Sequence, residues 1–336
     1  MRVCFCLFLL LSAPFLMASS EESLNTDIYL TSETKILHHL VEGGFVGKDS
    51  KSIKFGYLRN QNSKKSIILV PGFGESYKKY REVFFDFYNQ GYSVFMFDLR
   101  GMGISESLQP NPQIIDVINF EDYVNDLQLF YETIVKQFND EIVILAGHST
   151  GGLVATYAVL NGVIKPHKLV LFSPLFKLNF SFLPQVFVEF LMKGSAIVRG
   201  DAGYIVGASD RTFTDYPIKN STISSSAIRV KRALDIMRKY PQLLSGGPSN
   251  RWVLNILSAT NDLKSKVGNF DVPVLLIQVE HDIYVDTVAH ATICALMPDC
   301  KLELIGAAKH EILFEKDLYR NRALDLVFGF LSDNRL

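Results

Sequence analysis

The sequence predicts an α/β fold in which helices cover both faces of a mostly parallel sheet. Short apolar runs alternate along the chain with longer segments whose apolar residues recur at helical spacing. This alternation is typical of parallel strands joined by right-handed helical crossovers. It breaks once, over residues 174–271, which contain no clear strand and are far longer than an ordinary loop. We therefore expect a helical cap inserted into a sheet-containing core.

The first twenty residues have the layout of a secretory signal peptide. Arg2 precedes an uncharged stretch at 3–17, and small residues at 18–20 are followed by two glutamates. The apolar stretch is shorter than the roughly 20 residues that a membrane-spanning helix needs. We expect export to the periplasm or the medium after cleavage, with membrane association through an uncleaved segment as the alternative.

The core is expected in two parts, residues 21–173 and 272–336, on either side of the cap. Two strands with a turn near 48–50 are expected in 43–58, and further strands at 66–70, 92–97, 142–148, 167–172, 272–279 and 301–305. Helices are expected at 75–90, 120–138, 150–160, 284–296 and 317–331.

Residues 142–152 (IVILAGHSTGG) are the stretch around which the chain is organised. An apolar run ends at Gly147, and a helical pattern begins after Ser149. Gly147 and Gly151 complete a G-x-S-x-G pattern, in which a sharp strand-to-helix turn projects a serine hydroxyl above the sheet. The pattern occurs by chance in many chains, but its position after a buried strand favours a nucleophile at Ser149.

A serine nucleophile needs a base, and the base needs an orienting carboxylate. In this type of fold both follow the serine in the order acid, then histidine, on loops after strands. Asp282 follows the 272–279 strand and His310 follows the 301–305 strand, so we expect them to complete the triad. Glu280 and Asp286 are alternative acids, because the sequence does not fix the direction of that loop.

An oxyanion intermediate also needs hydrogen-bond donors. The backbone N–H of Thr150, which follows the nucleophile, is one candidate. The second is expected from the turn after the 66–70 strand, where flanking glycines let the backbone N–H of Phe73 approach the substrate.

Four segments carry a family resemblance: residues 71–76 (PGFGES), 97–103 (FDLRGMG), 147–152 (GHSTGG) and 306–317 (GAAKHEILFEKD). They resemble the α/β-hydrolases of the monoacylglycerol lipase and bacterial lysophospholipase branch, from about residue 43 to the C-terminus. Pro71 and Met102 stand where the branch commonly has histidine. Pro71 also occurs on the lysophospholipase side, so it favours that subgroup.

The resemblance implies a serine carboxylester hydrolase acting on single-chain lipids, first lysophospholipids and then monoacylglycerols. A general carboxylesterase, a serine aminopeptidase and a non-catalytic binding member of the fold are the alternatives. The net charge of −1 gives no reason to expect nucleic acid as a partner. Neither a metal nor a cofactor is expected, because no ligand cluster or phosphate-binding loop is present in the sequence.

The cap begins with a densely apolar segment and continues with a basic helix at 228–240. We expect four apolar side chains of the first segment to contact the acyl chain: Leu183, Phe187, Phe190 and Leu191. The basic helix is expected to hold the cap against an anionic membrane surface, or else to be an ordinary solvated helix.

Two cysteines follow the leader, Cys294 near the end of a predicted helix and Cys300 at the start of the last strand. Export would place them in an oxidising compartment, where they either form a disulfide or remain buried thiols.

Overall fold

The computed structural model describes residues 18–180 and 183–333, so most of the predicted leader lies outside the described residues. Its centre is a sheet of order β1-β2-β4-β3-β6-β7-β9-β10. Only the β1–β2 and β2–β4 pairs are antiparallel, and the other neighbours run parallel. The strands of the sheet are β1 (Val41–Val46), β2 (Ser52–Leu58), β3 (Lys65–Val70), β4 (Ser93–Phe97), β6 (Ile142–His148), β7 (Lys168–Phe172), β9 (Val274–His281) and β10 (Cys300–Lys309). The predicted α/β fold is confirmed.

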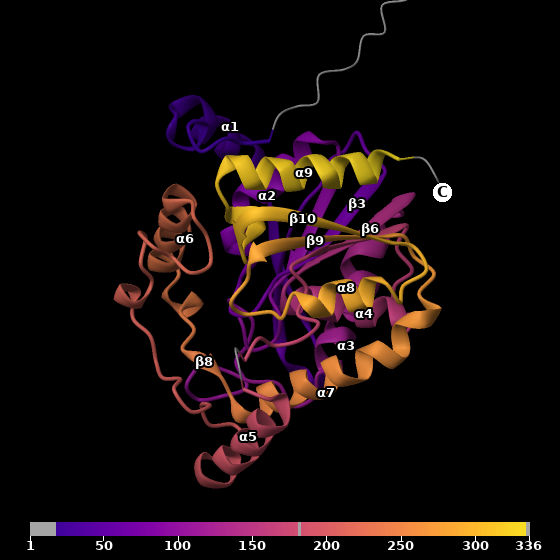
Figure 1. Ribbon diagram of the computed structural model, residues 1–336. Coiled ribbons are helices and arrows are strands. Elements are labelled where there is room, and N and C mark those ends of the chain that lie inside the picture. The colour runs from indigo at the N-terminus through magenta and orange to yellow at the C-terminus, as the bar shows by residue number, and fades with distance from the viewer. Residues whose placement is uncertain (1–17, 181–182, 334–336) are drawn as a thin grey trace, which may run out of the picture.

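Helices cover both faces of this sheet (Figure 1). The helices of the described residues are α1 (Asp27–Leu37), α2 (Arg81–Asn89), α3 (Glu121–Phe130), α4 (Thr150–Leu160), α5 (Gln185–Arg199), α6 (Ala227–Lys239), α7 (Asn250–Lys266), α8 (Val288–Cys294) and α9 (Asp317–Ser332), of which α5 and α6 lie away from the sheet. Alternation along β3 divides the core, because successive side chains on a strand point to opposite faces. Ile67 and Leu69 pack with residues of α2 and α9, whereas Ile68 and Val70 pack with residues of α3, α4 and α7.

Two helices begin later than their periodicity predicts, because acidic and hydroxyl side chains hold the preceding backbone in turns. After β3 the chain forms a 3₁₀ turn, η3 (Tyr77–Tyr80), before α2, and the side chain of Ser76 accepts from the N–H of Lys78. After β9, one oxygen of Asp282 accepts from the N–H groups of Tyr284 and Val285, both at 2.9 Å. These turns keep short polar loops at the carboxyl ends of the strands, which is where a site can form.

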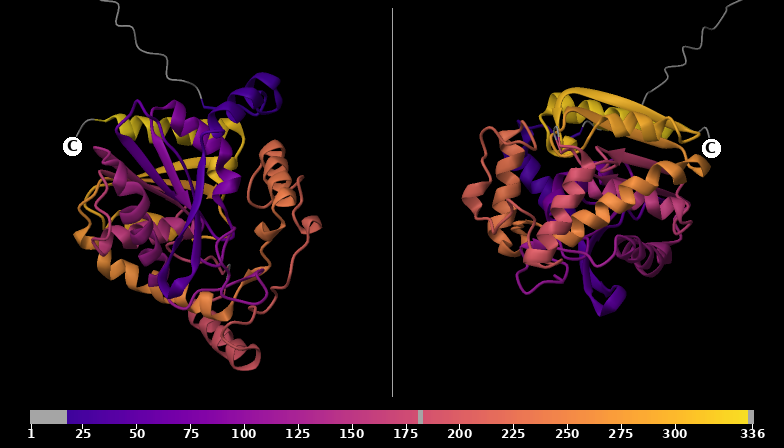
Figure 2. Two further views of the ribbon diagram at one scale, coloured as in Figure 1. Left: turned by 180° about the vertical axis from the view of Figure 1, so that it is seen from behind. Right: turned by 60° about the horizontal axis from the view of Figure 1, so that its bottom comes forward.

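The segment between β7 and β9 contains α5, α6, the short strand β8 (Gly247–Pro248) and α7. Its first part runs along one side of the molecule, with α5 and α6 at opposite ends (Figures 1 and 2). β8 pairs with β5 (Ile114–Ile115), which belongs to the loop after β4. In contrast, α7 packs into the core, where Trp252, Ile256 and Leu263 are buried in the same cluster as α3 and α4.

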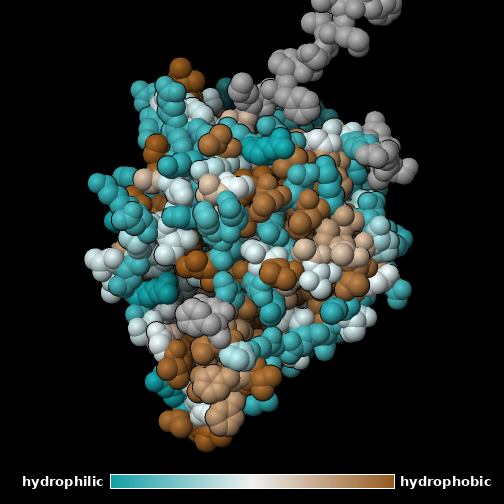
Figure 3. Space-filling model, in the orientation of Figure 1, coloured by the Kyte–Doolittle hydropathy of each residue, from teal (hydrophilic) through white to brown (hydrophobic). Residues whose placement is uncertain are grey.

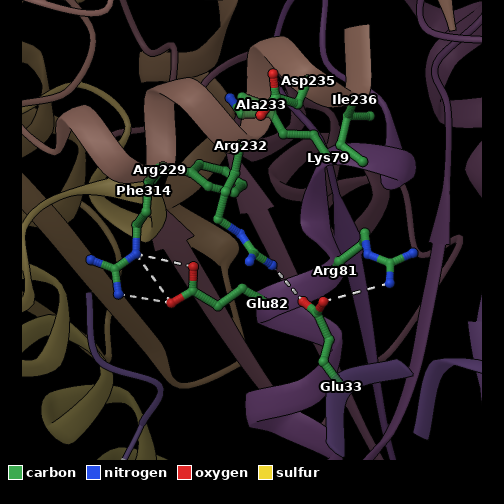
Figure 4. A pocket seen from close by; sticks show the side chains of 10 residues that line it. All are labelled: Glu33, Lys79, Arg81, Glu82, Arg229, Arg232, Ala233, Asp235, Ile236 and Phe314. Atoms are coloured by element: carbon green, nitrogen blue, oxygen red, sulfur yellow. Dashed lines mark hydrogen bonds and ion pairs between the residues drawn. The ribbon is translucent and has the colours of Figure 1, made fainter. Parts of the chain in front are cut away.

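Two arginines of the basic helix α6, Arg229 and Arg232, bind carboxylates of the core and do not face a membrane surface. Arg229 is only 2% exposed and binds Glu82 of α2, with its Nη2 2.8 Å from Oε1. Arg232 bonds to Glu33 of α1 at 2.7 Å, and these pairs line a cavity of about 230 Å³ (Figure 4). Lys231, although exposed, is paired with Asp235 on its own helix. Helix α6 therefore fastens the cap to the core, because burying a guanidinium requires paired carboxylates.

The segment just after residue 17 belongs to the folded body. Ser19 is buried, and both its N–H and its hydroxyl donate to Asp86 of α2, at 3.0 and 2.7 Å. Its carbonyl accepts from Arg229 of the cap. Two residues later, the N–H of Glu21 donates to Asp317 at 2.8 Å. Within the described residues, no helix is both long and apolar enough to cross a bilayer.

Cys294 and Cys300 form a disulfide that joins the end of α8 to the start of β10, with their Cα atoms 5.4 Å apart. We expect Cys294 and Cys300 to react as free thiols only after reduction of the denatured protein. The C294S/C300S double variant should lose about 2 kcal/mol of unfolding free energy, because the bond closes a short loop in the unfolded chain. Thiol titration and urea unfolding measure these two quantities. Two free thiols in unreduced protein would exclude the bond.

Candidate active site

Ser149 lies on the turn between β6 and α4 in a backbone conformation that L-residues rarely adopt, with φ 51° and ψ −118°. The turn is held by the N–H of Ser149, which donates to the carbonyl of Phe172 on β7, and by the carbonyl of Ser149, which accepts from Leu175. Such strained backbone is found where function requires one orientation of a side chain. The turn therefore holds the Ser149 hydroxyl at the carboxyl edge of the sheet.

The two glycines of the elbow are required by close backbone contacts. A Cβ atom at Gly147 would lie 2.4 Å from the carbonyl oxygen of Gly151, and one at Gly151 would lie 2.2 Å from that of Val70. Any side chain at either position would push the start of α4 away from β3 and β6. The G-x-S-x-G pattern thus has a steric cause in this chain.

Asp282 and His310 come together from the loops after β9 and β10. Nδ1 of His310 lies 2.6 Å from Oδ2 of Asp282, while Oδ1 of Asp282 is occupied by two backbone N–H groups. Burial would raise the pKa of Asp282, but the hydrogen bond and charge of His310 and these N–H groups lower it below its ordinary value. An ionised Asp282 accepts a hydrogen bond from the Nδ1–H of His310, which keeps the proton on Nδ1 and leaves Nε2 as a base.

The two alternative acids bond elsewhere. Glu280 accepts from the N–H of Ala307, in the irregular part of β10, at 2.7 Å. Asp286 forms an ion pair with Lys177 at 2.6 Å and accepts from the N–H of Val288 at the start of α8. The structure thus brings only Asp282, among these three carboxylates, to the ring of His310.

The turn after β3 lies against the nucleophile. A Cβ atom at Gly72 would lie 3.2 Å from the Cβ of Ser149, so the next peptide, which carries the N–H of Phe73, passes close to it. The N–H of Phe73 and that of Thr150 bond to no acceptor within residues 18–180 and 183–333. The ring of Phe73 packs edge-on against Trp252 of α7, with centroids 4.7 Å apart. Two backbone donors are thus available beside Ser149, as an oxyanion requires.

A buried polar cluster, which the sequence interpretation missed, lies behind these groups. His148 contacts Glu75 through Nδ1 and the carbonyl of His310 through Nε2, at 2.9 and 3.2 Å. Lys79 of η3 bridges Glu75 and Glu311, at 2.8 and 2.6 Å. All these residues lie within or next to the segments that carry the family resemblance, but no spacing rule indicates that they pair.

The four predicted cap residues remain on the surface. Leu183, Phe187, Phe190 and Leu191 are 40–71% exposed, whereas Val188 and Met192 of α5 are buried in the core cluster. The four predicted residues therefore form an exposed apolar surface and not the wall of a closed pocket. No group of three or more His, Cys, Asp or Glu residues in the described part of the chain could hold a metal ion.

Comparisons with known proteins find lipid ester hydrolases and the same fold. The probable lysophospholipase L2 of Haemophilus influenzae is 32% identical over 293 residues, which cover 85% of this chain and 90% of that protein. Lysophospholipase L2 of Escherichia coli is 28% identical over 298 residues, 87% of each chain. A soluble variant of monoglyceride lipase from Saccharomyces cerevisiae, solved with a substrate analog, has a TM-score of 0.65 and 20% identity, covering 88% of this chain and 95% of that one.

Together, the sheet, the elbow and these similarities define the class: the chain is an enzyme, a carboxylic ester hydrolase with the α/β-hydrolase fold. More narrowly, it belongs to the family described as serine aminopeptidase S33, which matches residues 61–317.

Proposed function

We propose that this protein hydrolyses the acyl ester of lysophospholipids by a serine mechanism. The observation that carries the chemistry is the 2.6 Å contact between His310 and Asp282 at the sheet edge that presents Ser149. The lipid substrate is supported by the two lysophospholipases L2, each aligned over more than four fifths of both chains.

In the proposed reaction, Nε2 of His310 takes the proton of Ser149 as Oγ attacks the acyl carbonyl. The N–H groups of Phe73 and Thr150 stabilise the oxyanion of the tetrahedral intermediate. His310 then returns the proton to the departing alcohol oxygen of the glycerophosphate part, leaving an acyl group on Ser149. Water, activated by the same histidine, hydrolyses this ester and releases the fatty acid.

Contact with a membrane surface is proposed for α5. Its exposed apolar residues include Val186, Phe190, Ile197 and Val198, which are 71–86% exposed. They gather in the apolar tip of the molecule formed by α5 (Figure 3). Exposed apolar patches of this kind mark interaction sites, and a single-chain lipid resides in or exchanges with a bilayer. Docking by α5 would bring the cap to its substrate without help from the basic face of α6.

Replacing Phe190 by aspartate should reduce turnover of long-chain lysophospholipid in vesicles by about tenfold, because burying a phenylalanine contributes roughly 2 kcal/mol. Turnover of a short soluble ester should stay within twofold of wild type. The matched control is Leu318→Asp, since Leu318 is similarly exposed, at 76%, but belongs to α9, which lies at the opposite end of the molecule from α5. Equal losses for both variants, or no loss for Phe190→Asp, would contradict docking by α5.

Export with removal of a leader is also proposed, from the charge and apolar layout of residues 1–20. Ser19 and Ser20 end this stretch. Cleavage after residue 20 would therefore remove Ser19 together with its hydrogen bonds to Asp86 and Arg229. Fractionation of cells and mass determination of the mature N-terminus test the proposal. An intact N-terminus in the membrane fraction would favour the uncleaved anchor.

A substrate panel decides between the proposed activity and its alternatives. Purified mature protein should hydrolyse lysophospholipid with a higher kcat/KM than monoacylglycerol, a short-chain ester or an aminoacyl arylamide. The family description makes the aminoacyl substrate the necessary comparison. A preference for it would replace the lipid assignment with a peptidase, and turnover of none of them would leave only the binding function.

A further inference from the structure

A cluster of four ionisable side chains lies beside the triad: His148, Glu75, Lys79 and Glu311. His148 is 3% exposed, Glu75 6% and Glu311 8%. The triad mechanism uses none of these side chains. Such a group of buried ionisable residues is costly unless it is fully paired, so its presence beside Ser149 needs an explanation.

The partners of His148 determine its protonation. Nδ1 lies 2.9 Å from a carboxylate oxygen of Glu75, and Nε2 lies 3.2 Å from the carbonyl oxygen of His310. Glu75 is itself a carboxylate, because it also accepts from Lys79, the hydroxyl of Tyr80 and the N–H of Gly72. A carboxylate and a carbonyl can only accept, so both ring nitrogens of His148 must donate. His148 is therefore an imidazolium.

The charges of the cluster balance. Lys79 and His148 supply two positive charges, and Glu75 and Glu311 supply two negative charges. Burial would lower the pKa of His148, but the charge and hydrogen bond of Glu75 raise it above its ordinary value. Burial would likewise raise the pKa of Glu75, but Lys79 and His148 hold it well below its usual range.

This cluster touches three catalytic elements at once. Glu75 accepts from the N–H of Gly72, the residue before the oxyanion donor Phe73. His148 directly precedes Ser149 and bonds to the main chain of His310, with the two imidazole centroids 4.9 Å apart. A change in any one of these contacts would therefore shift the base relative to both the nucleophile and the oxyanion donors.

We propose that His148 is a positioning residue: as a cation held by Glu75, it donates to the carbonyl of His310 and fixes the catalytic base relative to Ser149. This inference rests on the proposed serine hydrolysis but not on the lipid substrate. The sign of its pH dependence follows from the charge. The contact is intact below the ordinary histidine pKa of about 6.5 and is lost only as pH rises through the elevated value in the folded protein.

The charge state is tested first, on the wild-type protein labelled with ¹⁵N-histidine. Long-range ¹H–¹⁵N correlation at about pH 7, just above the ordinary histidine pKa of about 6.5, should show both nitrogens of His148 still protonated. The signal is assigned by its absence in His148→Gln. Glu75→Gln removes the counter-charge and should shift this titration to lower pH. A singly protonated His148 in wild type at this pH would overturn the proposal.

The positioning role is tested by kinetics on a short chromogenic ester, so a failure of the lysophospholipid assignment leaves the test valid. His148→Gln should lower kcat by about tenfold or more, since small displacements of a catalytic group are costly, and should leave KM within twofold. Wild-type kcat should decrease as the pH rises through the elevated pKa of His148, and this decrease should be absent in His148→Gln. Glu75→Gln should move that decrease to lower pH.

The matched control is His167→Gln. His167 accepts from the N–H of Val143 near the opposite end of β6, far along the strand from Ser149. It should retain wild-type kcat and the wild-type pH profile. Wild-type kcat in His148→Gln, or a loss of kcat with an unchanged alkaline limb, would overturn the positioning role.

Discussion

Replacing Ser149 by alanine will reduce ester hydrolysis by roughly 10⁴-fold or more, because no other group can form the acyl intermediate. The fold should survive. Among the described residues the hydroxyl makes no hydrogen bond that holds the turn. The N–H of Ser149 donates to Phe172, and its carbonyl accepts from Gly152 and Leu175. Alanine also removes no apolar packing. Turnover of a short ester and a circular dichroism melt, measured on the same preparation, give the two quantities.

Ser173 provides the control for this experiment. It is fully buried at the end of the neighbouring strand β7 and also has a positive φ, of 42°. Its hydroxyl has no hydrogen-bond partner among the described residues. Ser173→Ala should therefore keep near-wild-type turnover and melting temperature. Residual activity above a few per cent in Ser149→Ala, with a normal melt, would assign the nucleophile to another residue.

Most of the fold could be predicted because its signals are local. Buried parallel strands are short apolar runs, and the elbow glycines sit where a Cβ would overlap the backbone. The late starts of α2 and α8 could not be predicted, because side chains such as Ser76 and Asp282 compete with the helix for backbone N–H groups. Helical periodicity alone does not register this competition.

Part of the site could also be predicted, and part could not. The order of residues after predicted strands predicted Ser149, Asp282 and His310, because parallel strands bring their carboxyl ends to one edge of the sheet. The His148 cluster depends on contacts between residues far apart in the sequence, such as Glu75 with His148, and no periodicity encodes them. The expected contact of α6 with a membrane has a related explanation. A run of basic residues indicates a charged helix face, but only the fold shows that Arg229 and Arg232 of this face pair with Glu82 and Glu33.

Replacing Asp282 by asparagine is expected to reduce kcat by about 10⁴-fold, through the tautomer of His310. In the wild type, Oδ1 of Asp282 accepts from the N–H groups of Tyr284 and Val285, and Oδ2 accepts a hydrogen bond from the Nδ1–H of His310. Asparagine can preserve the two backbone bonds only by directing its oxygen toward them. Its amide NH₂ then faces Nδ1, which must become an acceptor.

The proton of His310 then resides on Nε2, the nitrogen that must take the proton of Ser149, so the base is blocked although its position is unchanged. The pH profile distinguishes this cause from misfolding. An asparagine does not titrate, so raising the pH should not restore kcat, while the melting temperature above about pH 5 should fall only modestly.

Glu280→Gln is the matched control, because Glu280 stands two residues away and bonds to the N–H of Ala307 instead of a histidine. Asp286→Asn, which removes the ion pair with Lys177 but keeps an oxygen that can accept from the N–H of Val288, should likewise keep kcat within a few-fold of wild type. If either control loses activity to the level expected of Asp282→Asn, or if Asp282→Asn stays within tenfold of wild type, the acid partner of His310 has been assigned to the wrong carboxylate.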